Sequence, residues 1–149
     1  MLAFVVLLAA LWPGGATATD LERQVKAAYL LKFAHYVDWP DGAFATPDSA
    51  IVFGIVGDRP LGNALSALVA GKKLDGRPLH VRQLRPDDPL DGVHLLFVGP
   101  LDRDDLNATL DAARMRPLLT VSDARDGRIA GAMVNFVIVD QRLRFEIAL

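Results

Sequence analysis

The stretch VKAAYLLKFAHYVDWP, residues 25–40, predicts an apolar, aromatic-rich helix that ends at a Trp-Pro pair. Because Pro40 disfavours the helical conformation at Trp39, the helix should end near Val37 or Asp38. The rest of the chain supplies the sheet on which such a helix can pack.

The start and the apolar face of this helix follow from the spacing of its side chains. Thr19 and Glu22 stand three residues apart, as in a capping box, which predicts the helix N-terminus. Projected onto a helical wheel, five side chains form one broad apolar face, namely Leu21, Val25, Tyr29, Phe33 and Tyr36. The simplest account of most of these side chains is packing on the chain's own sheet; the alternative is contact with another subunit or partner. The candidate partner-binding or dimer-interface residues are Tyr29, Phe33, Tyr36, Trp39 and Pro40.

The first eighteen residues have the pattern of a secretory signal. They contain no charged side chain, and an apolar run from Leu2 to Trp12 is broken by Pro-Gly-Gly and followed by Ala16-Thr17-Ala18. The run is too short for a transmembrane helix, which needs about 20 residues. We therefore expect a cleaved signal peptide at residues 1–18, a single domain at residues 19–149, and export of that domain from the cytoplasm.

Composition excludes several classes of protein. The formal net charge of −2 argues against nucleic acid as a partner, because phosphate binding needs a basic excess. Cysteine is absent, so an exported protein of this sequence has no disulfide and no thiolate zinc site.

The order of apolar runs predicts the fold class. Continuous apolar runs at residues 51–56, 93–98 and 118–121 are typical of strands covered on both faces. Helical spacing follows the first two runs, and Asp102 can cap the second of these helices. Residues 132–139 and 142–147 predict a terminal hairpin that turns at Asp140-Gln141. The sequence predicts a three-layer α/β sandwich with a mostly parallel sheet, an antiparallel C-terminal edge hairpin and the N-terminal helix packed on it.

Ligands of such sheets usually bind beyond the carboxyl ends of the strands. The small-ligand candidates at those ends are Gly57, Asp58, Arg59, Gly62, Ser122 and Asp123, together with Asn135, the one polar residue within an apolar strand. The glycines have neither dinucleotide-binding nor Walker A spacing, which favours a simple strand-to-helix connection. A buried amide needs a partner, so Asn135 is expected to hold a neighbouring loop.

No catalytic or metal-binding constellation is apparent. None of Ser49, Ser66 and Ser122 lies in a nucleophile elbow, and the three histidines lack metal-ligand spacing. His94, on an apolar strand, is expected to be a hydrogen-bonded core residue. The sequence therefore predicts no catalytic residue, no metal and no cofactor.

The ordered set of segments resembles the YfiR-like family of periplasmic repressors. The resemblance is carried by VKAAYLLKFAHYVDWP, by IVFGIVGDRPLGNAL at residues 51–65, by GRPLHVRQL at 76–84, by HLLFVG at 94–99, by LLTVSD at 118–123, and by GAMVNFV and LRFEI at 131–137 and 143–147. It covers nearly the whole chain after residue 18. One departure is Val93, where many members have a cysteine, so thiol-based tuning is excluded here.

The resemblance implies a non-enzymatic, often dimeric periplasmic protein. It implies inhibition of a membrane-bound diguanylate cyclase through its periplasmic region, and so control of cyclic di-GMP, biofilm formation and motility. It also implies sequestration by an outer-membrane peptidoglycan-binding lipoprotein. The alternative is a periplasmic small-molecule-binding module with its ligand at the carboxyl ends of the strands, and an unrecognised hydrolase is a third.

Overall fold

A computed structural model of the chain describes residues 17–123 and 131–148. Residues 1–16 of the predicted signal peptide lie outside the described residues; the last two, Thr17 and Ala18, cap and begin the first helix. That helix is α1 (Ala18–Tyr36), followed by the 3-10 turn η1 (Asp41–Ala43). The remaining helices are α2 (Arg59–Val69) and α3 (Arg103–Arg114).

Seven strands of the described chain form one sheet in the order β2-β3-β1-β4-β5-β6-β7. Their bounds are β1 (Ile51–Val56), β2 (Lys73–Leu74), β3 (Arg77–Leu84), β4 (Leu95–Val98), β5 (Leu119–Asp123), β6 (Val134–Val139) and β7 (Arg142–Ile147). The five central strands are parallel, whereas β2 and β7 pair antiparallel at the two edges. The predicted α/β fold with an antiparallel terminal hairpin is confirmed, and the short strand β2 is an addition that the sequence pattern did not reveal.

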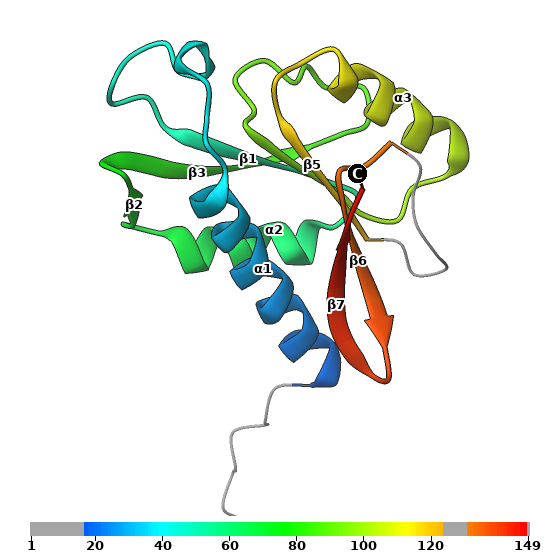
Figure 1. Ribbon diagram of the computed structural model, residues 1–149. Helices are drawn as coiled ribbons and strands as arrows, with labels where there is room; N and C mark the ends of the chain where they lie inside the picture. The colour runs from blue at the N-terminus through cyan, green and yellow to red at the C-terminus, as the bar shows by residue number, and fades with distance from the viewer. Residues whose placement is uncertain (1–16, 124–130, 149) are drawn as a thin grey trace, which may run out of the picture.

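Helices cover both faces of this sheet (Figure 1). One apolar core lies between the sheet and the pair α1 and α2, with fully buried Leu30, Leu61 and Phe97 among its members. The other lies between the sheet and α3, around Leu96 and Leu110. Strands that contact a core on each face must be apolar throughout, which explains the uninterrupted runs in the sequence.

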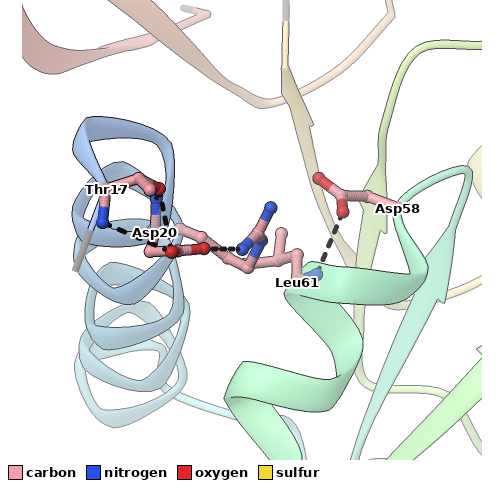
Figure 2. A network of polar contacts seen from close by, with 5 residues as sticks. Thr17, Asp20, Asp58 and Leu61 are labelled. Atoms are coloured by element: carbon pink, nitrogen blue, oxygen red, sulfur yellow. Dashed lines mark hydrogen bonds and ion pairs between the residues drawn. The ribbon is translucent and has the colours of Figure 1, made fainter. Parts of the chain in front are cut away.

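The helix starts are fixed by side-chain caps (Figure 2). Asp102 caps α3 as predicted, accepting from Asp105 N at 2.9 Å. The predicted capping box of α1 at Thr19 and Glu22 is wrong: Thr17 accepts from Asp20 N at 3.2 Å, and the box is Thr17 with Asp20. Because the helix already begins at Ala18, Thr19 lies within its first turn and cannot be the cap; the Glu22 carboxylate instead pairs with the ammonium of Lys26 at 2.5 Å.

The predicted apolar face of α1 is confirmed only in part, since Tyr29 and Phe33 pack against the core but the most buried side of the helix is a different one. The buried residues of α1 are Lys26, Ala27, Leu30 and Ala34, whereas Leu21 and Tyr36 are exposed. The small side chains of Ala27 and Ala34 let the helix backbone approach the neighbouring layer closely. The bulky stripe through Tyr29 and Phe33 is thereby turned sideways, toward the terminal hairpin.

Two backbone segments approach each other closely just after the ends of the neighbouring strands β1 and β4. Gly57 has φ +79°, and a Cβ built on Gly99 would lie 2.9 Å from the carbonyl carbon and oxygen of Gly57. Neither backbone segment can move aside without disturbing its strand.

Gly99→Ala is therefore expected to lower the free energy of unfolding by about 1–3 kcal/mol, the range for overpacking a tight site. Gly62→Ala is the matched control: its Cβ would meet the flexible end of Gln83, which can swing away. Because alanine also favours the α2 helix by about 1 kcal/mol over glycine, that variant should be close to neutral. Urea denaturation of both variants measures the difference, and equal stabilities would contradict the prediction.

Candidate partner-binding groove

An open apolar groove of the described chain lies between α1 and the terminal hairpin. Its volume is about 650 Å³, and it opens to the surface. The lining residues come from α1, β5, β6 and β7 and the segments beside them: Tyr29, Lys32, Phe33, Tyr36, Val37, Leu119, Met133, Val134, Phe145, Ile147 and Ala148. We call this feature the α1–β7 groove.

Aromatic rings build one end of the α1–β7 groove. The Phe145 ring centroid lies 5.0 Å from that of Phe33 and 5.5 Å from that of Tyr29, both in edge-to-face contact. Beneath them, Phe136 is fully buried and its ring centroid lies 5.9 Å from that of Phe33. Such ring pairs are stabilising and hold the two sides of the groove at a fixed separation.

The groove leaves large apolar side chains accessible. Tyr36 is 77% exposed, Ile147 59%, Met133 48% and Phe145 40%. Leu143, Phe145 and Ile147 alternate with charged residues along β7, but α1 covers this apolar side only in part. A contiguous exposed apolar patch of this kind is typical of an interaction surface.

The structure separates the five interface candidates into two places. Tyr29, Phe33 and Tyr36 line the α1–β7 groove. Trp39 does not, because its indole Nε1 donates to the Ala34 carbonyl at 3.2 Å and its ring packs against His94. Pro40 precedes the η1 turn and does not line the groove.

Sequence reasoning missed the contribution of the hairpin to this surface. Met133, Phe145 and Ile147 were not among the interface candidates, although all three line the groove. Leu143, Phe145 and Ile147 alternate with charged residues and so share one face of β7. A local pattern cannot show how far a helix from the other end of the chain extends over that face.

His94 is a structural residue, as predicted. Its Nδ1 accepts from Val52 N at 3.1 Å, and its Nε2 donates to the Ala43 carbonyl at 2.8 Å. The ring stacks on Phe44, with centroids 4.6 Å apart. His94 therefore joins the η1 loop to the sheet, and neither ring nitrogen is left for a metal or a substrate.

The small-ligand candidates are mostly engaged within the protein. Asp58 caps α2, accepting from Leu61 N at 3.0 Å (Figure 2). Gly62 lies against the Gln83 side chain, which donates to the Arg59 carbonyl at 3.1 Å. Gly57 and Asp58 line two polar hollows of about 230 and 640 Å³, and Arg59 lines the larger.

The remaining ligand candidates lie on β5 and β6 with their polar atoms turned inward. Ser122 donates to the Asn135 side-chain oxygen across the strand pair, and both residues are fully buried. Asn135 thus has the internal partner that a buried amide requires, on the adjacent strand rather than in a loop.

Asp123 forms a buried ion pair with α1. Its Oδ2 lies 2.8 Å from Lys26 Nζ, and both side chains are less than 10% exposed. Burial of the Lys26 ammonium opposes its charge, yet the hydrogen bonds that it donates to Asp123 and Glu22 prevail and raise the pKa of Lys26 above its ordinary value. This pair fixes the N-terminal half of α1 to the end of β5.

Within residues 17–123 and 131–148, no group of three or more histidine, aspartate or glutamate side chains is arranged to hold a metal ion. None of the helices in the same part of the chain combines the length and hydropathy that crossing a bilayer requires.

The fold and the α1–β7 groove define a three-layer α/β domain with an open apolar groove between its first helix and its terminal hairpin. The chain belongs to the YfiR/HmsC-like family, whose model matches residues 23–149. This is a regulatory family whose members act through protein partners. No curated protein compared with the chain matches it.

Proposed function

We propose that this protein is a periplasmic, non-enzymatic regulator that binds the periplasmic region of an inner-membrane diguanylate cyclase and inhibits it. The expected consequence is a lower level of cyclic di-GMP, with effects on biofilm formation and motility. Membership of the YfiR/HmsC-like family supports this proposal. An outer-membrane peptidoglycan-binding lipoprotein that sequesters the regulator would relieve the inhibition.

The observation that carries the proposal is the open α1–β7 groove. It combines aromatic and aliphatic side chains that the chain's own core leaves accessible, with Lys32 as the one charged lining residue. Interfaces are strongest where such anchors become fully desolvated at the centre of the contact. The polar candidates at the strand ends are instead satisfied internally, which favours a protein partner over a small ligand.

Met133→Glu tests the groove directly. Met133 lines the groove and is 48% exposed, so the glutamate can remain solvated in the unbound protein. Binding would bury this carboxylate without a partner, which costs several kcal/mol, and each 1.4 kcal/mol weakens affinity about tenfold. In a strain lacking the gene, which should contain raised cyclic di-GMP, wild-type protein should restore the low level and Met133→Glu should not.

Met115→Glu is the matched control. Met115 lies at the C-terminal cap of α3, is 86% exposed and does not line the groove. It should restore low cyclic di-GMP as well as wild type does, and both variants should unfold within about 0.5 kcal/mol of wild type. Unchanged cyclic di-GMP after gene deletion would overturn the proposed function. Full complementation by Met133→Glu would show that the α1–β7 groove is not the surface that binds the partner.

A further inference from the structure

The edge strand β7 presents a regular set of unused backbone groups. It is the last strand of the sheet, and no strand of the described chain lies on its outer side. Val139 and Arg142 pair across the two-residue turn of Asp140 and Gln141, both of which have positive φ. A pair that closes such a turn is hydrogen-bonded, and hydrogen-bonded pairs alternate along an antiparallel ladder.

This alternation determines which residues of β7 direct their backbone groups outward. Arg142, Arg144 and Glu146 hydrogen-bond toward β6, and the bond from Ala148 N to the Met133 carbonyl at 2.8 Å continues the same series. The residues between them, Leu143, Phe145 and Ile147, direct their N–H and C=O groups to the open edge. The same three residues share the side of the sheet that faces the α1–β7 groove, since Phe145 and Ile147 line it.

We propose that this edge pairs with the same edge of a second copy, so that β7 and its symmetry mate form an antiparallel ladder centred on Phe145. A two-fold axis perpendicular to the sheet keeps the same face of both copies on the same side, so only residues of equal parity can stand opposite each other. With Phe145 opposite Phe145, Leu143 stands opposite Ile147. All three outward residues of each copy then find hydrogen-bond partners.

Charge selects this register from its neighbours. In the register centred on Phe145, Arg144 stands opposite Glu146 of the second copy, twice by symmetry. A shift of the centre by one residue toward the turn places Arg144 opposite Arg144, and a shift in the other direction places Glu146 opposite Glu146. Opposite charges directly across a ladder stabilise it and like charges destabilise it. The shift toward the turn also places Arg142 opposite Glu146, but of the three alignments only the one centred on Phe145 sets opposite charges across the ladder without a like-charged pair.

The pairing also covers apolar surface that the single copy leaves in water. Phe145 and Ile147 are 40% and 59% exposed in the monomer and would meet their counterparts across the axis. Charged residues on an edge strand commonly prevent adhesion to other strands. In β7, the arginines disfavour pairing with other strands, whereas Glu146 allows the pairing with a second copy in which it stands opposite Arg144. The inference does not rest on the proposed function, because it follows from the edge strand alone; the paired copies would place both α1–β7 grooves on one face of a continuous sheet.

Single-cysteine variants of the full domain test the register, because the chain contains no cysteine of its own. Under mild oxidation, Phe145→Cys should become mainly a disulfide-linked dimer, since Cα atoms of a hydrogen-bonded antiparallel pair lie about 5.5 Å apart, within disulfide range. Arg144→Cys is the matched control and should remain mainly monomeric in denaturing gels, because its counterpart lies on the diagonal. Faster cross-linking of Arg144→Cys than of Phe145→Cys would overturn the register.

Charge exchange tests the pairing without a disulfide and without altering Phe145. Wild type should sediment as a dimer, Arg144→Glu should shift to monomer, and Arg144→Glu combined with Glu146→Arg should recover the dimer. A monomeric wild type, or a dimer indifferent to these changes, would overturn the inference. The pairing of β7 is tested by cross-linking and sedimentation, whereas the regulatory function is tested by cyclic di-GMP measurements. Failure of one is therefore distinguishable from failure of the other.

Discussion

Asp123→Ala is expected to lower the free energy of unfolding by about 3–5 kcal/mol, because removal of one member of a buried ion pair leaves the other charge buried without its buried counter-charge. The remaining charge is the ammonium of Lys26, which is 5% exposed and, among the residues that the structure describes, keeps its ion pair with Glu22. The loss should appear in urea denaturation at neutral pH as a lower midpoint.

Two variants make this prediction specific. Glu22→Ala removes the more exposed partner of Lys26, since the Glu22 side chain is 37% accessible. This variant should lower the free energy of unfolding by no more than about 1 kcal/mol. Lys26→Met combined with Asp123→Leu replaces both buried charges with apolar groups and should recover most of the stability lost in Asp123→Ala. A double variant as unstable as Asp123→Ala would show that the ion pair is not the source of the loss.

The same pair predicts a dependence on alkaline pH. The hydrogen bonds of Asp123 and Glu22 raise the pKa of Lys26 in the folded protein, so folding favours the protonated amine. This contribution is fully present below the unfolded lysine pKa of about 10.4 and is lost as the pH rises through the higher folded value. Wild type should therefore lose more stability in this alkaline range than the variant that carries Lys26→Met and Asp123→Leu.

Phe136→Ala is expected to have an effect of similar size, about 3–5 kcal/mol, as for other fully buried phenylalanines. Phe136 is fully buried, and its ring centroid lies 5.9 Å from that of Phe33, 6.1 Å from that of Tyr29 and 6.3 Å from that of Phe97. The cavity would open directly beneath the aromatic end of the α1–β7 groove. Denaturation with urea or guanidinium measures the stability of this variant.

Phe145→Ala is the matched control for this prediction. Phe145 pairs with Phe136 across β6 and β7 but is 40% exposed, so less apolar surface is lost and water can enter the space. Its cost should be clearly smaller than that of Phe136→Ala. Equal costs for the two variants would contradict the view that the core, rather than the groove surface, holds α1 to the sheet.

Local features of the fold could be predicted where a short segment contains the whole physical cause. Pro40 ends α1 near the expected residue, Asp102 caps α3, and Asp140-Gln141 turns the terminal hairpin. Likewise, an uninterrupted apolar run can be buried only between two layers, so the parallel sheet followed from β1, β4 and β5. The hydrogen-bonded role of His94 followed from its position within such a run.

The candidate site could be predicted only in part, because its two sides come from opposite ends of the chain. Tyr29, Phe33 and Tyr36 were selected from the surplus of aromatics on α1, and all three line the groove. Trp39 was selected for the same reason, but a carbonyl of the preceding turn and the ring of His94 hold it elsewhere. No local sequence signal distinguishes an aromatic side chain that lines the groove from one, such as Trp39, that packs elsewhere.

The sequence by itself determined the order of elements, their main boundaries, the alternation along β7 and the absence of thiol chemistry, because each depends on residues close together in the chain or on composition alone. Only the tertiary structure decided which stripe of α1 is buried. The alanines at positions 27 and 34 allow close approach, and the distant Asp123 holds Lys26 in the interface, so the aromatic stripe turns toward β7 and remains partly open. The groove exists because the rotation of one helix was set by contacts some hundred residues away in the chain.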